Sequence, residues 1–165
     1  MSKIKTQEEI IKISKNLRDQ AKVVVATNGC FDILHLAHVN LLEKAKKEGD
    51  VLIVLLNSDL SIKKFKSPNR PIFPENERAR ILAAFESVDY VTIFDEDDPL
   101  YLYKKIKPNK IAKGGTYIPD KVEQHKKLLE KYGGEFVHFP LEQGYSSTKF
   151  INKIVNIEKE RYKSN

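Results

Sequence analysis

Two histidines three positions apart are the residues in this chain best suited to chemistry. They are His35 and His38 in the stretch TNGCFDILHLAH, residues 27–38, which follows a short apolar run. Such a pair can bind a metal, fill a core, or donate hydrogen bonds to phosphate oxygens. A metal site needs further ligands, and only Asp32 is placed to complete one. The spacing therefore favours imidazoles acting on phosphate, with the metal and core roles as the alternatives.

The residues before the histidines predict a cradle for that phosphate. A strand ending near Thr27 would be followed by a tight turn at Asn28 and Gly29, where glycine supplies conformational freedom. A helix starting around residues 34–36 would then place His35 and His38 about one turn apart, on one face of its positive end. Backbone N–H groups after Gly29 and that helix end together form a natural phosphate site.

The elements that position this stretch can be read from the apolar pattern. Short apolar runs predict strands at residues 22–27, 50–57, 89–94, 110–114 and 134–139. The segments between them have helical spacing, with Pro74 expected in the first turn of one helix and Asp98 expected as the N-cap of the next. This alternation predicts an α/β fold, a Rossmann-like open parallel five-stranded sheet with helices on both faces.

We expect a single domain over residues 1–165, with residues 1–20 forming an N-terminal helix that packs on the core. The polar segment 63–73 contains two prolines and is predicted to be a mobile loop over the sheet edge. In such sheets ligands bind outside the carboxyl ends of the strands, and each unusual motif of this chain falls at such an end.

Charge and composition narrow the class of partner. The net charge is +6, but the basic residues are spread along the chain, which favours a small phosphorylated ligand over nucleic acid. Cys30 is the only cysteine, so no intrachain disulfide can form. No apolar run approaches the roughly 20 residues of a membrane span, and the N-terminus lacks the apolar core of a signal peptide. We therefore expect a cytoplasmic protein with no membrane partner.

Two motifs resemble the signatures of the cytidylyltransferase-like nucleotidyltransferases. The first, a strand followed by G-x-F-D and H-x-G-H, reads here as Gly29-Cys30-Phe31-Asp32 and His35-Leu36-Ala37-His38. The second, at the start of the last helix, reads Ser146-Ser147-Thr148. Within that superfamily the chain is most similar to the heptose 1-phosphate adenylyltransferases, in segments such as NRPIFPENERARILAAFESVDYV and IAKGGTYIP. It departs from their pattern at Ala37, where the family has glycine, and at Thr116, where it has aspartate.

The resemblance implies a role for each matching position. His35 and His38 would stabilise charge on the α-phosphate and the departing pyrophosphate, and Lys63 and Lys66 would belong to a basic loop that closes on the phosphates. Asp32 would organise the site or, indirectly, its magnesium. The nucleotide would be bound by Asn28, Gly29, Cys30, Phe31, Asp32, Lys113, Gly114, Gly115, Ser146, Ser147 and Thr148. The acceptor or its phosphate would be bound by Asn57, Asp59, Arg70 and Arg78, the last of which is also a candidate for a structural role; His125 and His138 match nothing and are expected to be structural.

The reaction that follows from this resemblance is transfer of AMP from ATP to a sugar 1-phosphate, with Mg²⁺ as cofactor and a homodimer as an open possibility. It needs no protein nucleophile, because the acceptor oxygen is already anionic. The alternatives are transfer from CTP to a polyol phosphate such as glycerol 3-phosphate, a nucleotide-binding regulator without activity, and a fragment of a class I aminoacyl-tRNA synthetase.

Overall fold

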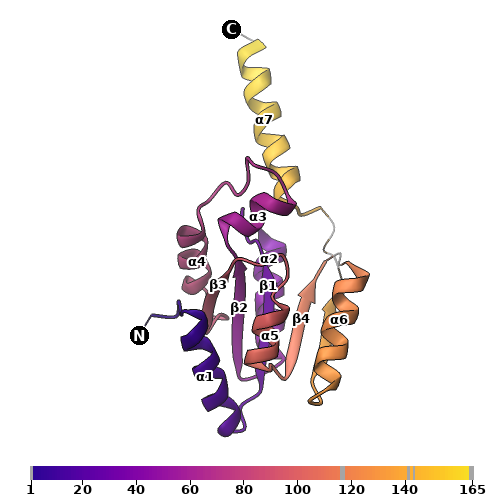
Figure 1. Ribbon diagram of the computed structural model, residues 1–165. Coiled ribbons are helices and arrows are strands. Elements are labelled where there is room, and N and C mark those ends of the chain that lie inside the picture. The colour runs from indigo at the N-terminus through magenta and orange to yellow at the C-terminus, as the bar shows by residue number, and fades with distance from the viewer. Residues whose placement is uncertain (1, 116–117, 141, 143, 164–165) are drawn as a thin grey trace.

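Five parallel strands form the centre of the computed structural model, which describes residues 2–115, 118–140, 142 and 144–163. The strand order is β3-β2-β1-β4-β5, and the strands point toward the end of the molecule where α3 lies (Figure 1). Their bounds are β1 Val24–Gly29, β2 Val51–Asn57, β3 Tyr90–Phe94, β4 Lys110–Gly114 and β5 Glu135–Phe139. The predicted Rossmann-like parallel sheet is confirmed.

Helices cover both faces of this sheet. One face carries α1 (Gln7–Asp19), α5 (Leu100–Ile106) and α6 (Pro119–Glu130), and the other carries α2 (Leu36–Lys47) and α4 (Glu75–Ala84). Alternate residues of β2 pack on opposite faces of the sheet: Ile53 packs with Ile10 and Leu102, whereas Val54 packs with Leu42 and Leu82. A strand buried on both faces must be apolar throughout, which explains the unbroken run VLIVLL.

The direction of the strand order reverses at β1. The chain moves from β1 to β2 and β3 on one side, then crosses to β4 and β5 on the other. Val25 of β1 is opposite Lys110 of β4, and Gly29 is opposite Leu56 of β2. The crevice outside the carboxyl ends of β1 and β4 is therefore the expected ligand site of this topology.

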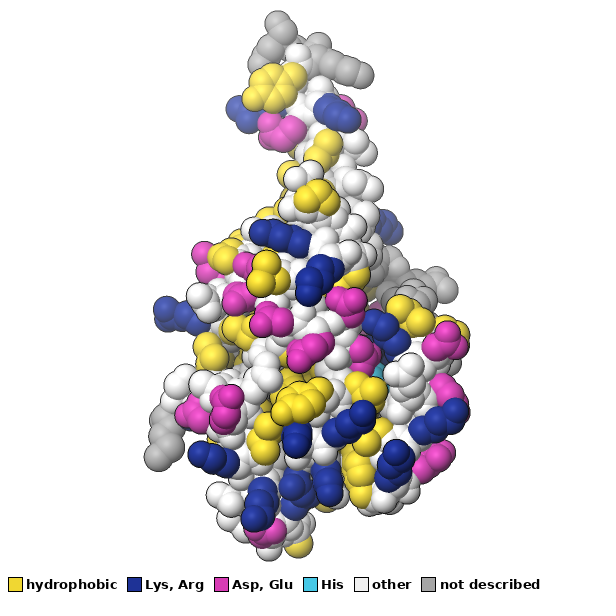
Figure 2. All heavy atoms as spheres, viewed as in Figure 1, with side chains coloured by type: hydrophobic (Ala, Val, Ile, Leu, Met, Phe, Trp, Pro, Cys, Tyr) yellow, Lys and Arg dark blue, Asp and Glu magenta, His cyan; other side chains and the backbone are white. Residues whose placement is uncertain are grey.

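Two further helices lie at that edge. Helix α3 (Asp59–Phe65) follows β2 directly, and α7 (Ser147–Lys163) starts near the sheet and then projects away from it (Figure 1). Figure 2 shows this projection as a narrow column with hydrophobic side chains on its surface. Ile154 and Ile157 are among the exposed residues of α7. Among the described residues, no helix combines the length and apolar character that crossing a bilayer requires.

The structure corrects three local predictions. The segment 63–73 is not all loop, because Lys63 to Phe65 form the end of α3, whose N-cap Ser58 accepts a hydrogen bond from Ser61 N. The rest of the segment is held rather than loose, since the Asp32 carboxylate accepts hydrogen bonds from Ile72 N and Phe73 N. Pro74 is the N-cap of α4, just before its first turn, and Pro99, not Asp98, is the N-cap of α5.

One buried cation links several segments at the carboxyl edge of the sheet. The Arg78 side chain has no exposed surface, and its guanidinium donates to the carbonyl oxygens of Phe73, Cys30 and Asn57 and to the Asp59 carboxylate at 2.6 Å. These groups belong to the ends of β1 and β2, the start of α3 and the segment before α4. The predicted ligand contact is therefore replaced by a structural role, because the guanidinium faces protein groups.

We expect Arg78→Met to lower the free energy of unfolding by about 3–5 kcal/mol, because it leaves the Asp59 carboxylate and three carbonyl groups without their donor. Urea denaturation would measure this loss. The matched control is Arg80→Met, an exposed arginine on the same helix, which should change stability by no more than about 0.5 kcal/mol. Equal effects of the two substitutions would contradict the role assigned to Arg78.

Candidate active site

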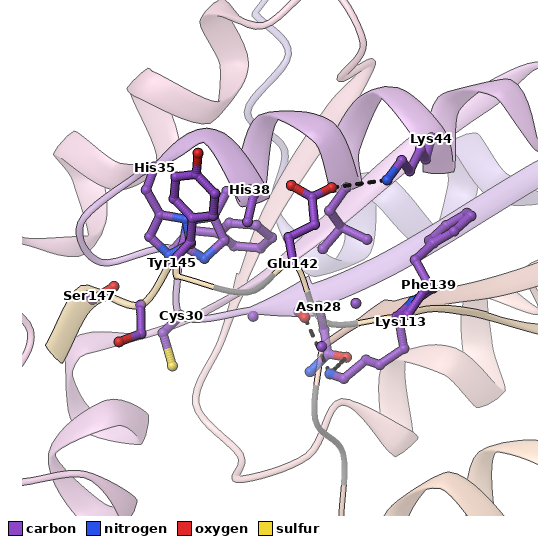
Figure 3. A pocket seen from close by; sticks show the side chains of 18 of the residues that line it. Asn28, Cys30, His35, His38, Lys44, Lys113, Phe139, Glu142, Tyr145 and Ser147 are labelled. Atoms are coloured by element: carbon purple, nitrogen blue, oxygen red, sulfur yellow. Dashed lines mark hydrogen bonds and ion pairs between the residues drawn. The ribbon is translucent and has the colours of Figure 1, made fainter. Parts of the chain in front are cut away.

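A cavity of about 400 Å³ opens at the carboxyl ends of β1 and β4. It brings together residues from the end of β1, the start of α2, the end of β4 and the start of α7 (Figure 3). Of the predicted site residues, these line it: Asn28, Gly29, Cys30, Phe31, His35, His38, Lys66, Lys113, Gly114, Gly115, Ser146, Ser147 and Thr148. Residues from opposite ends of the sequence thus converge at the edge that the topology favours.

The chain turns after β1 in a different way from the one predicted. Gly29 remains in the strand, and the residue in the left-handed region is Phe31, with φ 44°. Gly29 matters because a Cβ there would lie 3.0 Å from the Phe31 ring. The ring is buried and packs 5.2 Å from the His38 ring, centroid to centroid. A strained backbone at Phe31 thus places an aromatic support behind the catalytic candidate.

The two histidines form a stacked pair at the start of α2. His35 is the N-cap, α2 begins at Leu36 as predicted, and the ring centroids of His35 and His38 are 3.8 Å apart. The rings of Tyr145 and Phe150 flank His35 at 6.0 and 5.8 Å, and Figure 3 shows Tyr145 beside the pair. The Nδ1 atoms of both histidines are buried and have no hydrogen-bond partner among the described residues.

Burial keeps this pair uncharged in the free protein. Desolvation, together with the neighbouring His35 and Lys66, lowers the pKa of His38 to about 4. Desolvation also lowers the pKa of His35. Both imidazoles are therefore neutral at pH 7, and an arriving polyanion would favour their protonation.

Lys113 is another ionisable group in the cavity whose pKa is shifted by its surroundings. Its Nζ donates to Asn28 Oδ1 at 2.6 Å and to Asn28 O at 3.3 Å, and Tyr103 Oη donates to the same Oδ1 at 3.1 Å. No carboxylate of a described residue is within ion-pair distance of that Nζ. Desolvation lowers the pKa of Lys113 to about 8. The site therefore holds a cation whose partners are neutral oxygens.

Glycines follow Lys113 and let backbone approach the cavity. A Cβ on Gly114 would press on the Leu41 side chain at 3.0 Å, and Gly115 has φ 76°. The Gly115 N–H donates to Phe139 O, which links the ends of β4 and β5. His138 Nε2 lies 2.9 Å from Gly115 O. Thr116 lies outside the described residues.

The start of α7 adds helix N–H groups to the cavity. Ser146 Oγ accepts a hydrogen bond from Lys149 N, and Ser147 Oγ donates to Ile33 O at 3.2 Å. The second contact attaches the helix start to the loop that carries the histidines, 114 residues away. Ser146, Ser147 and Thr148 line the cavity, so the first turn of α7 lies at its wall. The positive end of this helix favours a phosphate group there.

The predicted basic loop divides into residues at the site and residues away from it. Lys66 lines the main cavity, and it also borders a neighbouring surface hollow with Arg70 and Thr148. The Arg70 Nε atom donates to Asp32 Oδ2 at 2.5 Å, whereas its Nη2 is buried without a partner among the described residues. Lys63 is exposed on α3 and does not line the main cavity.

Asp32 has a fastening role that limits it as a metal ligand. One oxygen accepts from Arg70, and the other accepts from Ile72 N and Phe73 N at 2.7 and 3.2 Å. Within the described part of the chain, no cluster of three or more metal-binding side chains exists. The protein groups seen here therefore do not form a cage for a divalent ion.

The cavity also includes residues that the sequence motifs did not indicate. Phe139 lines it from the end of β5, and Pro140, Glu142 and Tyr145 line it from the segment that follows. Glu142 accepts hydrogen bonds from Asn40 at 2.7 Å and Lys44 at 2.9 Å, which fastens this segment to α2 (Figure 3). The rule that ligands gather at strand ends would have found this segment, because it directly follows a predicted strand.

This arrangement suits transfer chemistry on phosphate. It offers neutral imidazoles, the lysines Lys66 and Lys113, a helix start and glycine backbone around one space. Cys30 lies in it, but burial raises the pKa of its thiol, so it is not activated as a nucleophile. Such a site can align anions and offset charge that moves between them.

Comparison with known proteins agrees with this class of chemistry. The family model described as Cytidylyltransferase-like matches residues 26–153. The chain is 46% identical over 155 residues to a bifunctional protein HldE from Syntrophotalea carbinolica, and 48% identical over 152 residues to one from Campylobacter jejuni subsp. doylei. These alignments cover 94% and 92% of this chain but 31% of each relative. The chain thus spans about a third of the length of these curated relatives.

Solved structures support the same fold. A lipopolysaccharide core biosynthesis protein from Thermoplasma volcanium superposes with a TM-score of 0.60 at 29% identity, over 76% of this chain and 99% of that one. A pantoate-beta-alanine ligase from Francisella tularensis gives a TM-score of 0.63 at 19% identity, over 87% of this chain and 68% of that one. Fold, cavity and relatives together define a nucleotidyltransferase enzyme. The chain belongs to the Cytidylyltransferase-like family.

The neutral state of His38 gives a testable titration. We expect an NMR pKa of about 4 for His38 in the free protein, which rises when a nucleoside triphosphate binds because the anion stabilises the protonated ring. Binding should then take up protons, so affinity for the triphosphate should increase as pH falls below 7. His38→Gln would identify the resonance and should reduce the proton uptake. A His38 pKa near 6.5 in the free protein would contradict the desolvated pair.

Proposed function

We propose that this enzyme transfers AMP from ATP to a sugar 1-phosphate, with heptose 1-phosphate as the preferred acceptor, to give the ADP-sugar and pyrophosphate. The observation that carries the proposal is the stacked pair of His35 and His38 in the lining of a cavity that is also lined by Lys66, Lys113 and the start of α7. The sugar and the adenine base are supported by the resemblance to heptose 1-phosphate adenylyltransferases over residues 22–155.

The reaction follows from the groups in the cavity. An oxygen of the acceptor phosphate forms a bond to the α-phosphorus, and the bond to the bridging oxygen breaks, so that the electron pair leaves with pyrophosphate. His35 and His38 would donate to oxygens of the α-phosphate and the leaving group. Lys66 and the N–H groups at the start of α7 would hold the β- and γ-phosphates, where charge builds up.

The metal would enter with the nucleotide. Nucleotidyltransferases generally use divalent ions, and Mg²⁺ binds readily to phosphates while keeping several waters. The Asp32 oxygens are already occupied by Arg70 and backbone N–H groups. We therefore assign Mg²⁺ to the substrate as its ATP complex, with no direct ligand required from the described residues.

A pyrophosphate-release assay tests the substrates directly. Purified enzyme would receive each nucleoside triphosphate with heptose 1-phosphate or glycerol 3-phosphate, and we expect turnover with ATP and heptose 1-phosphate. Turnover with CTP and glycerol 3-phosphate alone would replace this proposal by the polyol phosphate reaction. Nucleotide binding without any turnover would favour a regulatory protein.

The histidine pair gives the mechanistic test. His38→Gln should lower kcat by about a hundredfold or more, because a donor to the developing charge is lost. The control is Lys127→Met, at an exposed lysine on α6 that does not line the cavity, which should leave kcat within about twofold. Circular dichroism would confirm that both variants are folded. Full activity of His38→Gln would exclude the proposed role of the pair.

A further inference from the structure

A second hollow lies beside the main cavity, at the other side of the β1 end. Its volume is about 200 Å³, half that of the cavity assigned to the nucleotide. The two share Asn28, Gly29, Cys30 and Lys113 as a common boundary. A molecule smaller than a nucleotide would therefore lie next to the reacting phosphate if it occupied this hollow.

The hollow is lined with polar groups that can form further hydrogen bonds. Asp98 Oδ1 lies 2.9 Å from His125 Nε2, whereas its Oδ2 makes no hydrogen bond to a described residue. Lys121 Nζ donates one hydrogen bond, to Asp97 O at 3.0 Å, and has two more to give. Asn57 is 3% exposed, and its amide nitrogen donates to Ser61 Oγ. A carboxylate, an amide and an ammonium group with free positions are well suited to a ligand rich in hydroxyl groups.

The groups beneath this lining hold it in place. His125 is 2% exposed, and the Tyr103 ring meets its ring edge-on at a centroid distance of 5.1 Å. Tyr103 in turn donates to Asn28, the acceptor of Lys113. Despite desolvation, which opposes it, the hydrogen bond and charge of His125 lower the pKa of Asp98, so the carboxylate is ionised. The lining is thus connected through buried side chains to the boundary of the nucleotide cavity.

We propose that this hollow binds the hydroxyl-bearing carbon chain of the phosphorylated acceptor, with Asp98, Lys121 and Asn57 contacting its hydroxyl groups and Lys113 contacting its phosphate. The assignment rests on the proposed nucleotidyl transfer and adds to it the position of the acceptor. Lys113 is the cation on the shared boundary, so a phosphate beside it lies between the two spaces. Asp98, Lys121 and His125 then gain a function that the family motifs do not indicate.

Binding measurements can separate this site from the nucleotide site. Enzyme saturated with α,β-methylene-ATP cannot complete transfer, so calorimetry would report acceptor affinity alone. The titrants are heptose 1-phosphate, glycerol 3-phosphate and inorganic phosphate. We expect at least one organic phosphate to bind about tenfold or more tightly than inorganic phosphate, because its hydroxyl groups meet the polar lining.

Two substitutions then test the lining. Asp98→Asn keeps the side-chain volume, and Lys121→Met keeps its length; each should weaken the preferred organic phosphate about tenfold or more. The affinity for α,β-methylene-ATP should stay within about threefold. Lys127→Met is the matched control, since Lys127 is an exposed lysine on the same helix, and it should change neither affinity.

The outcomes distinguish this inference from the proposed function. A preference for glycerol 3-phosphate that Asp98→Asn and Lys121→Met both remove would support the hollow as the acceptor site. It would overturn the proposal that the acceptor is a sugar 1-phosphate. If Lys121→Met bound the preferred acceptor with unchanged affinity, the hollow would not be the acceptor site, even where ATP and heptose 1-phosphate react. Equal binding of all three titrants to the unaltered enzyme would overturn it as well.

Discussion

The buried guanidinium of Arg78 is the interaction on which the site depends. A fully buried cation is costly unless its donors are paired, and here they reach three carbonyl groups and the Asp59 carboxylate. Those acceptors lie in separate segments that meet at the carboxyl edge of the sheet. Because the same cation bonds Cys30 and Asn57, the geometry of the turn after β1 is fixed relative to the end of β2. Asp32 extends this arrangement by holding the segment from Arg70 to Phe73.

Charge in the cavity is arranged so that it responds to phosphate. His35 and His38 are neutral because burial opposes their protonation, and Lys113 has only neutral oxygen acceptors among its described contacts. A triphosphate supplies the missing negative charge and makes protonation of these groups favourable. The site thus avoids strong repulsion between cations when empty, yet it offers several donors once the substrate is present.

The sequence predicted the fold well because its central strands β1 and β2 are largely buried on both faces. The apolar runs at 50–57 and 110–114 were predicted to be buried parallel strands, and β2 and β4 lie there. The motifs also located His35, His38 and Ser146 at strand-to-helix junctions. Local backbone was harder to predict: Phe31, not Gly29, takes the left-handed conformation, because tertiary packing of its ring outweighs the local preference. The roles of Arg78, Asp98 and Glu142 depend mainly on partners 19 to 102 residues away, which no local pattern reveals.

Cys30 has a consequence for the stereochemistry of the reaction. Its thiol lies at the boundary between the two spaces, yet burial keeps it protonated, so it does not compete with the acceptor for the α-phosphorus. Transfer in a single displacement inverts the configuration at that phosphorus, whereas a cysteinyl intermediate would restore it through two successive inversions. With an α-phosphorus made chiral by isotopic or sulfur substitution, the proposed direct transfer would therefore invert its configuration.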